Sequence, residues 1–526
     1  MSRELVKSTA VVSAMTMVSR LLGFVRDMVI ARVFGAGVGT DAFFVAFKIP
    51  NFLRRLFAEG AFSQAFVPVL SEYKATRDHE EVRLLARKVA GTLGGILFLV
   101  TLLGVIAAPL LIMVFAPGFI DEQEKFNLAS VMLRITFPYL LFISLTALAG
   151  GVLNSYGRFG VPAFTPVFLN ISMISVAIWL APRMERPVTA LAWGVFIAGT
   201  VQLLFQLPFL ARLRLLGWPR WDWHDPGVKR IVQLMLPAIF GSSVAQINLL
   251  FDTLLASLLV TGSVSWLYYS DRLVEFPLGV FGIALATVIL PSLSRQHATQ
   301  SAETFSRTLD WALRWVLLLG TPCSIGLFML AGPMLTTLFQ YGEFAATDVH
   351  MASLSLMAYA LGLLGFILVK VLAPGYYARQ DTRTPVRIGV IAMVANMVLN
   401  VLFVAPLAWY GVPGPHAGLA LATASSAFLN AGMLFRGLYR EGVFRPQPGW
   451  GKLLLQVVVA NLVLAIIIGT VAGDLSEWLA WGWLERVGRL ALCISLGAGV
   501  YMIALLLLGI RPAQLLGRRA GYGSGA

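Results

Sequence analysis

The chain contains the stretch TMVSRLLGFVRDMVIARVFG at residues 16–35, part of an apolar segment, 8–34, that is long enough for a membrane helix yet carries Arg20 and Arg26 near its middle. The next apolar stretch, TDAFFVAFKIPNFLRRLFAEGAFSQAFVP at 40–68, repeats this pattern with Arg54. A charged side chain at the centre of a bilayer costs roughly 2.5–3.5 kcal/mol on insertion scales. Repeated arginines at this depth indicate a polar cavity inside a helix bundle, suited to an anionic ligand.

The composition is that of a polytopic membrane protein. Hydrophobic residues make up 58% of the 526 residues and charged residues 13%, and the mean hydropathy is +0.80, which excludes an ordinary soluble domain. The net charge of +14 is explained by basic loops at one membrane face, so no nucleic-acid partner is expected. The two cysteines lie in apolar segments without metal-ligand spacing, so no metal site or resident cofactor is expected.

Apolar runs of 20 or more residues recur fourteen times between polar or Pro/Gly-rich connectors. Because about 20 apolar residues cross a bilayer as a helix, we predict an all-α polytopic membrane protein with about 14 transmembrane helices. The predicted spans are 8–34, 41–70, 89–116, 128–153, 161–181, 188–210, 231–260, 264–293, 313–339, 348–376, 386–409, 416–438, 453–473 and 488–510.

Basic residues fill every second connector, as the positive-inside rule requires of cytoplasmic loops. Most of the 40 Lys and Arg residues follow this pattern, which predicts that both termini are cytoplasmic and that the number of spans is even. The connectors on the opposite side hold only four basic residues, Lys125, Arg183, Arg186 and Arg486.

The chain repeats itself at an offset of about 223 residues. The segment AAPLLIMVFAPGF (107–119) aligns with AGPMLTTLFQYGE (331–343), and Pro68 falls on Pro291 in a second matching segment. Six spans per repeat preserve orientation, so we predict a parallel repeat with a pseudo-two-fold axis along the membrane normal.

This repeat divides the chain into three predicted parts. Residues 1–215 form an N-lobe of helices 1–6, residues 216–445 form a C-lobe of helices 7–12, and residues 446–526 contain helices 13 and 14 and a cytoplasmic tail. Two lobes around a cavity are the usual architecture of transporters that work by alternating access.

The arginines differ in the partners that the sequence offers them. Arg55 lies four residues before Glu59, which is the spacing of an intrahelical ion pair, whereas Arg54 has no such partner. Arg272, in the later apolar segment 263–285, is three residues from Glu275 and adjacent to Asp271. Whether Arg272 binds a ligand or only pairs with these acids stays open at this point.

A basic cluster of this kind fits a diphosphate. Arginine presents planar, forked donors that match phosphate oxygens and keeps its charge at any relevant pH. Like charges that lack an anion repel strongly in a medium of low dielectric constant. The candidate ligands of the anion are Arg20, Arg26, Arg54 and Arg272.

A second hypothesis concerns a cation. Asp252 lies in the middle of the seventh predicted span, and Asn396 and Asn400 lie four residues apart on the eleventh. Hard monovalent cations such as sodium prefer oxygen ligands, so these three side chains are candidate ligands. The alternative is that Asp252 lines a cavity wall and that the asparagines bridge helices.

Five stretches resemble the MurJ/MviN family, the lipid II flippases of the multidrug/oligosaccharidyl-lipid/polysaccharide exporter superfamily. The resemblance spans the chain and rests on MTMVSRLLGFVRD (15–27), TDAFFVAFKIPNFLRRLFAEGAFSQAFVP (40–68), SVSWLYYSDRLVEFPLGV (263–280), LVKVLAPGYYARQDTRTPV (368–386) and PQPGW (446–450).

The resemblance implies a lipid II flippase of the bacterial inner membrane that serves peptidoglycan biosynthesis, and hence cell wall biogenesis and cell shape. It implies a cationic cavity between two lobes, with helices 13 and 14 forming a groove for the undecaprenyl tail. Lipid II and membrane lipids are the expected partners, and the peptidoglycan-synthesis machinery is a further candidate.

By motif match, the essential positions of the family fall on Ser19, Arg20, Arg26, Asp41, Arg54 and Arg272. Asp271, Glu275 and Lys370 are expected to have gating or supporting roles.

In the predicted mechanism the arginines hold the diphosphate headgroup while the two lobes alternate access. Gly23, Pro50 and Pro277 are the candidate hinges. Asp41, at the outer end of helix 2, is expected to join an outer gate with a basic residue of the other lobe.

Three other functions were weighed against this one. A drug exporter would need an acidic, aromatic cavity, and a glycosyltransferase would need catalytic carboxylates on a large loop, which this chain lacks. We therefore expect a transporter and not an enzyme. A flippase for another polyprenyl-diphosphate-linked glycan would use the same phosphate clamp and remains the main alternative.

Overall fold

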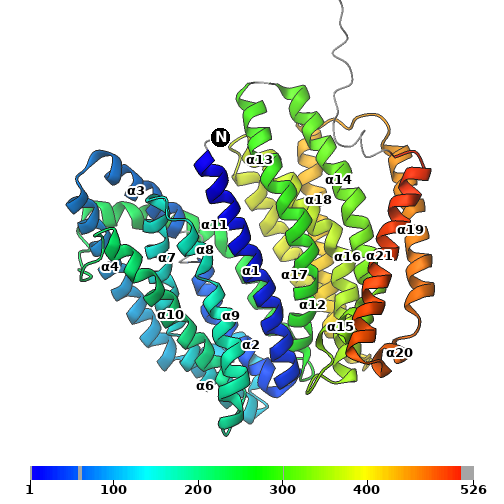
Figure 1. The fold of residues 1–526 in the computed structure, drawn as a ribbon, viewed down its shortest axis with the longest axis horizontal. Helices are drawn as coiled ribbons and strands as arrows, with labels where there is room; N and C mark the ends of the chain where they lie inside the picture. Colours follow the sequence, from blue (N-terminus) through cyan, green and yellow to red (C-terminus); the bar gives the residue numbers. More distant parts are fainter. Residues whose placement is uncertain (1–2, 57–61, 300, 511–526) are drawn as a thin grey trace, which may run out of the picture. The chain divides into compact units, whose positions relative to one another are not determined.

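The computed structural model describes residues 3–56, 62–299 and 301–510, and within these residues every regular element is helical (Figure 1). The predicted all-α class is therefore confirmed. The predicted C-terminal part extends to Ala526, so its last residues, 511–526, lie outside the described residues.

The chain separates into two compact units. Unit 1 comprises Met1–Ser265 with Tyr341–Ala345, and unit 2 comprises Trp266–Gln340 with Ala346–Ala526. The seventh predicted span therefore belongs to the same compact unit as the first six.

The helices of unit 1 range from 3₁₀ turns of three residues to helices of 32 residues. They are α1 (Arg3–Phe34), α2 (Val38–Arg54), α3 (Ser63–Thr76), α4 (His79–Ile106), α5 (Ala108–Phe115), η2 (Pro117–Phe119), α6 (Gln123–Thr136), α7 (Tyr139–Ser155), α8 (Gly160–Phe164), α9 (Val167–Ser175), η3 (Val176–Leu180), η4 (Ala181–Arg183), α10 (Thr189–Arg212) and α11 (Pro226–Ser257).

Helix α12 (Ser263–Pro277) begins at the end of unit 1 and continues into unit 2. The remaining elements are η5 (Leu278–Gly282), α13 (Ile283–Ala298), α14 (Ala302–Met329), α15 (Ala331–Phe339), α16 (Ala346–Tyr377), α17 (Arg383–Trp409), α18 (His416–Arg440), α19 (Trp450–Ala472), α20 (Leu475–Ala480) and α21 (Trp483–Leu507).

Eleven helical segments of the described residues are long and apolar enough to cross a membrane. The predicted spans 8–34, 41–70 and 231–260 are not among the eleven, although α1, α2, α3 and α11 show that their described residues are helical. The first two of these spans carry three of the four candidate arginines, Arg20, Arg26 and Arg54, whose charge lowers the mean hydropathy of the spans.

The helix boundaries repeat at the offset that the sequence predicts. Helix α4 begins at His79 and α14 begins at Ala302, 223 residues later. Their ends, Ile106 and Met329, keep the same spacing, and short helices α5 and α15 follow them. The segments α4–α5 and α14–α15 therefore share the same order of a long and a short helix.

The three candidate hinges differ in local structure. Helix α1 continues through Gly23, and α2 continues through Pro50. Pro277 ends α12, and the next five residues, Leu278–Gly282, form a π-helical turn. Such turns are frequent at functional sites because the wider winding interrupts the regular hydrogen-bond ladder.

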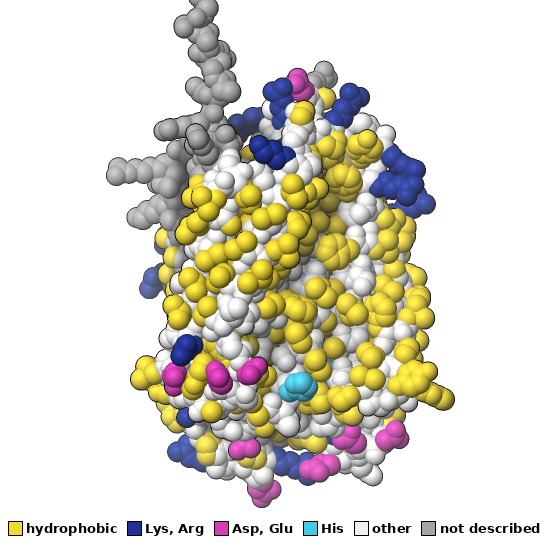
Figure 2. Space-filling model, turned by 90° about the vertical axis from the view of Figure 1, so that its right-hand side faces the viewer, with side chains coloured by type: hydrophobic (Ala, Val, Ile, Leu, Met, Phe, Trp, Pro, Cys, Tyr) yellow, Lys and Arg dark blue, Asp and Glu magenta, His cyan; other side chains and the backbone are white. Residues whose placement is uncertain are grey.

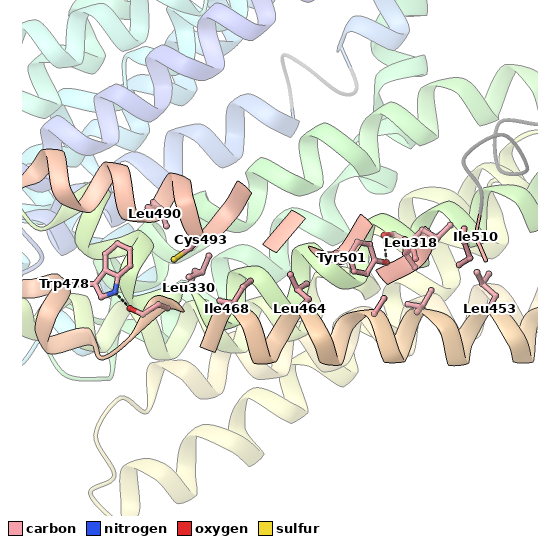
Figure 3. Packing of buried hydrophobic residues seen from close by; sticks show 14 residues of the cluster. Leu318, Leu330, Leu453, Leu464, Ile468, Trp478, Leu490, Cys493, Tyr501 and Ile510 are labelled. Carbon is pink, nitrogen blue, oxygen red and sulfur yellow. Dashed lines mark hydrogen bonds between the residues drawn. The ribbon is translucent and has the colours of Figure 1, made fainter. Parts of the chain in front are cut away.

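Helices α19 and α21 pack on each other and on α14 within unit 2. The Tyr501 hydroxyl donates to the Leu318 carbonyl at 2.9 Å, and the Trp478 indole donates to the Ala472 carbonyl at 2.7 Å (Figure 3). The side of the molecule on which α19 and α21 lie is covered by hydrophobic side chains through its middle, and charged side chains gather toward its two ends (Figure 2). This distribution is the one that a membrane requires.

The connector between α10 and α11 folds back along α4. The Arg220 amide donates to the Arg87 carbonyl at 3.0 Å, and the Lys88 ammonium lies 2.9 Å from Asp222 and 2.6 Å from Asp225. The hydrogen bond from Lys88 lowers the pKa of the Asp222 carboxyl below its usual value. These contacts fix the start of α11 on α4.

Two glycines on α4 make this close approach possible. A side chain at Gly91 would overlap the backbone of Arg220, and one at Gly95 would overlap the Trp221 ring. Gly94, between them, faces only the end of Leu145, at 3.6 Å from where a Cβ would lie. Gly91 and Gly95 therefore form the face of α4 on which the connector is seated.

This packing predicts opposite outcomes for two neighbouring substitutions. Gly91→Ala should destabilise the protein by about 1–3 kcal/mol, because backbone cannot move aside as a side chain can. Gly94→Ala should change the stability by less than about 1 kcal/mol, since alanine also favours the helix. The measurement is the thermal unfolding midpoint of the purified protein in detergent. Equal midpoints for the two variants would contradict the close packing of the connector on Gly91.

Candidate functional site

The two arginines of α1 lie in different environments. Arg20 is exposed, and within the described residues its side chain forms no hydrogen bond or ion pair. Arg26 is only 6% exposed. Ser19, the position before Arg20, is partly buried. Of the two arginines, Arg20 is therefore the one directly accessible in this conformation.

Arg26 is held by a carboxylate and an amide. Its Nε and Nη2 donate to Oδ1 of Asp27 at 2.9 and 2.7 Å, and its Nη1 donates to Oδ1 of Asn170 at 3.1 Å. Asp27 is 1% exposed, so the ion pair lies inside unit 1. A buried arginine next to a buried carboxylate satisfies the requirement that charges taken from water be paired.

These contacts were only partly predictable. Helical spacing places Asp27 on the face of Arg20, seven residues away, but the structure pairs Asp27 with its chain neighbour Arg26. The long guanidinium side chain bends back to reach it. Asn170, on α9, was missed altogether, since nothing in a single sequence links residue 170 to residue 26.

Arg54 also has a partner that spacing rules for charged pairs overlooked. Its Nε donates to Oδ1 of Asn51 at 2.8 Å, so a neutral amide three residues earlier holds it. Arg54 and Arg55 are both partly buried. The predicted partner of Arg55, Glu59, lies outside the described residues.

Asp41 is a buried carboxylate that accepts hydrogen bonds from both backbone and side-chain donors. It is 1% exposed at the start of α2. Its Oδ2 accepts from the Gly262 amide at 2.7 Å, and its Oδ1 accepts from the amide and hydroxyl of Ser265 at 2.9 and 2.6 Å. Asp41 thus joins α2 to the connector between α11 and α12 and to the first turn of α12.

The basic partner of Asp41 is Lys125, on α6, at 3.2 Å. The prediction of a basic residue from the second lobe is therefore wrong for this conformation, because Lys125 belongs to the first repeat. Lys125 also donates to the Thr261 hydroxyl at 3.0 Å and lies over the ring of Phe119. The second repeat contributes backbone amides and a hydroxyl instead of a cation.

In unit 2, Arg272 forms an ion pair but its side chain is still partly exposed. Its Nη1 lies 2.8 Å from Glu275, and its Nη2 donates to the Tyr268 hydroxyl at 3.2 Å. The side chain of Arg272 is 34% exposed, and an ion pair at such a position contributes little, about 0–1 kcal/mol. Asp271, beside it, and Lys370, on α16, are exposed.

The three candidate cation ligands fall in different units. Asp252 lies on α11 in unit 1, and Asn396 and Asn400 lie on α17 in unit 2. The Asn400 amide donates to Oδ1 of Asn396 at 2.9 Å, and the Asn396 amide donates to the Thr423 hydroxyl at 3.3 Å. Both asparagines are fully buried, so α17 and α18 share a polar seam.

Comparisons with known proteins agree with this architecture. The family model described as "Lipid II flippase MurJ" matches residues 30–485. A probable lipid II flippase MurJ of Vibrio cholerae serotype O1 is 53% identical over 522 residues, which covers 98% of each chain. A solved structure of lipid II flippase MurJ in an inward closed conformation has a TM-score of 0.78 and 27% identity, covering 94% of this chain and 98% of that chain.

A more distant likeness extends to the fold alone. The inward-facing structure of a multidrug resistance MATE family transporter of the MOP superfamily has a TM-score of 0.65 at 14% identity. It covers 82% of this chain and 98% of that chain. The part of this chain that it leaves uncovered is larger than for the first structure.

The Asp41 site yields a prediction on stability. Lys125→Met leaves a buried carboxylate without its cation and should destabilise the protein by about 3–5 kcal/mol. The control is Arg183→Met, which removes an exposed basic residue from the same predicted face and should cost less than about 0.5 kcal/mol. Chemical or thermal unfolding of the purified variants measures both.

A double variant tests whether the two charges act on each other. Asp41→Asn with Lys125→Met removes both charges and should be more stable than Lys125→Met alone. If the double variant is less stable by the sum of the two single effects, Asp41 and Lys125 do not stabilise one another.

Proposed function

Because this chain belongs to the lipid II flippase MurJ family, we propose that it moves lipid II from the cytoplasmic to the periplasmic leaflet by alternating access. The observation that carries the proposal is the 53% identity to a probable lipid II flippase over 98% of both chains. The protein is a transporter and not an enzyme. The chain contains no phosphate-binding P-loop motif, so the energy has to come from an ion gradient, the membrane potential or consumption of the product.

The diphosphate of the substrate is the group that the arginines bind in this proposal. Arg20 and Arg54 are the first contacts, because Arg20 is exposed and Arg54 is only partly buried. A phosphate oxygen can replace the amide oxygen of Asn51 that accepts from Arg54, and it adds a charge interaction to that contact. Arg26, which is buried against Asp27, joins only after it rearranges.

Arg272 is the contact from unit 2. Its pairing with Glu275 and its use by the substrate are compatible, because an exposed ion pair is weak enough to exchange for a diphosphate. Tyr268 orients the guanidinium through its hydroxyl and lies under it at 5.0 Å from the ring centre. Asp271 and Lys370 have supporting roles in this proposal.

The protein is a multi-pass inner-membrane protein, and we place both termini in the cytoplasm. The connectors predicted to be periplasmic hold four basic residues, and two of these are buried in contacts within the protein, which supports this orientation. Lys125 pairs with Asp41, and the buried Arg486 donates to the carbonyls of Trp478 and Thr336 at 2.9 and 3.2 Å. They are therefore not free charges of the kind that set topology.

The prenyl tail is proposed to lie against α19 and α21. Large apolar side chains on these helices are exposed, among them Leu455, Leu462, Ile466, Ile503 and Leu507. They present an apolar surface in the part of the chain that follows the two repeats. The same proposal includes association with the peptidoglycan-synthesis machinery.

The cation hypothesis is retained as a secondary proposal. It rests on the polar seam around Asn396 and Asn400, whose side-chain oxygens are the ligand type that sodium prefers. Asp252→Asn should then lower transport and weaken its dependence on the sodium gradient, measured in proteoliposomes with and without sodium. Unchanged transport and unchanged sodium dependence would remove Asp252 from the proposal.

The main test compares lipid II translocation in cells depleted of their own flippase. Arg20→Ala, Arg54→Ala and Arg272→Ala should each reduce translocation about tenfold or more, because each removes a charge-assisted hydrogen bond to the diphosphate. Translocation is measured by labelling lipid II in the outer leaflet at matched amounts of protein in the membrane.

A matched control makes this series decisive. Arg183→Ala removes an exposed arginine that is not a candidate ligand, and this variant should translocate lipid II normally. Normal translocation by all three arginine variants would overturn the diphosphate clamp. Absence of translocation by the parent, with transport of another polyprenyl-diphosphate-linked glycan, would favour the alternative substrate.

A further inference from the structure

Asn170 joins two parts of α1 that lie two helical turns apart. It is 5% exposed on α9. Its Oδ1 accepts from Nη1 of Arg26 at 3.1 Å, and its Nδ2 donates to the carbonyl of Ser19 at 2.9 Å. The amide therefore uses its oxygen as an acceptor for Arg26 and its nitrogen as a donor to Ser19.

Gly23 of α1 lies beside this amide. Gly23 lies between Ser19 and Arg26 on the face that meets α9, and a Cβ placed on it would lie 3.7 Å from both Oδ1 and Nδ2 of Asn170. Residues four and three positions apart share one helix face, so Ser19, Gly23 and Arg26 form a continuous strip. Asn170 lies over the middle of this strip.

The charges in this group balance without Asn170. Asp27 Oδ1 accepts from two nitrogen atoms of the Arg26 guanidinium, so the pair is neutral and buried. Asn170 adds a further hydrogen bond to the guanidinium but no charge. It directs Nη1 without strengthening the electrostatic hold on Arg26.

We propose that Asn170 is a positioning residue for the diphosphate site, acting through Arg26. This inference rests on the proposed function, because it takes a polyprenyl diphosphate as the ligand. The neutral amide keeps the guanidinium aligned along α1 and yields Nη1 to a phosphate oxygen when the ligand enters. The exchange leaves no buried charge unpaired, which a carboxylate at position 170 would not allow.

The chemistry of both contacts explains why an amide is needed. Aspartate at 170 would hold Arg26 with a second negative charge and would place a carboxylate oxygen against the Ser19 carbonyl. Leucine at 170 would remove both the acceptor for Nη1 of the buried Arg26 and the donor to the Ser19 carbonyl. Either change misplaces Arg26, although the two act through opposite changes in charge.

The test measures binding of two lipids to the full-length protein in nanodiscs. The probes are undecaprenyl diphosphate and undecaprenol, which share the tail and differ in the anion. Asn170→Asp and Asn170→Leu should each weaken binding of the diphosphate about tenfold, in line with loss of a hydrogen bond to a charged group. Binding of undecaprenol should not change, and this split separates positioning from general damage to the fold.

Two further variants complete the experiment: a control at another buried amide, and a double variant that moves the carboxylate from one side of Arg26 to the other. Gln206 is a buried amide of unit 1, 1% exposed, that donates to the Thr165 hydroxyl at 2.8 Å. Gln206→Leu should bind both probes as the parent does. Asp27→Asn combined with Asn170→Asp moves the carboxylate across Arg26 and should recover part of the diphosphate affinity that Asn170→Asp loses.

The outcomes distinguish this inference from the proposed function. If Arg26→Ala loses diphosphate binding and both Asn170 variants retain it, Asn170 has no positioning role and the proposed function stands. If the parent binds the diphosphate and undecaprenol equally, the anion site itself is wrong and the inference fails with it. Because Asn170→Asp is isosteric, it keeps the test valid where Asn170→Leu does not fold.

Discussion

The cost of placing charge in a membrane protein governs how this structure is built. Each charged side chain at depth has to be paired, hydrogen-bonded or exposed to water, and the structure uses all three solutions. Arg26 is paired with Asp27, Asp41 is surrounded by donors, and Arg20 is exposed. The pairing of helices in unit 1 follows from these requirements as much as from apolar packing.

The Asp41 network shows how such a pairing organises several elements together. One carboxylate receives the ammonium of Lys125 from α6 and backbone amides that precede and begin α12. Backbone amides are fixed in direction, so they stabilise the carboxylate only when the connector has one conformation. The start of α2, the start of α6 and the connector before α12 therefore depend on one another.

The sequence predicts the features that depend on local or repeated patterns. Apolar length identifies the helices, and the offset of about 223 residues reappears in the ends of α4 and α14. Four arginines stand out because a charge within an apolar run is rare in any protein. These signals lie within a single segment or recur along the chain, so one sequence is enough to read them.

The partners of the charged groups were harder to predict, because they depend on which helices pack together. Asn170 contacts Arg26 across 144 residues, and Lys125 rather than a residue of the second repeat meets Asp41. Even the local partner of Arg54 was missed, since rules for opposite charges overlook the neutral Asn51. Tertiary packing decides such contacts, and no spacing rule encodes it.

Those neutral partners have a common physical consequence. Arg26 and Arg54 each donate to an asparagine Oδ1, at 3.1 and 2.8 Å, from Asn170 and Asn51 respectively. An amide oxygen accepts a hydrogen bond in the same manner as a phosphate oxygen but carries no charge, so it can keep an arginine in place and still lose the competition to an anion. Arg26 also pairs with Asp27, so a diphosphate has to compete with a carboxylate there, and the contact to Asn170 is the one that exchanges more readily. A neutral amide among the partners of an arginine gives an entering diphosphate a contact that it can replace without separating two opposite charges.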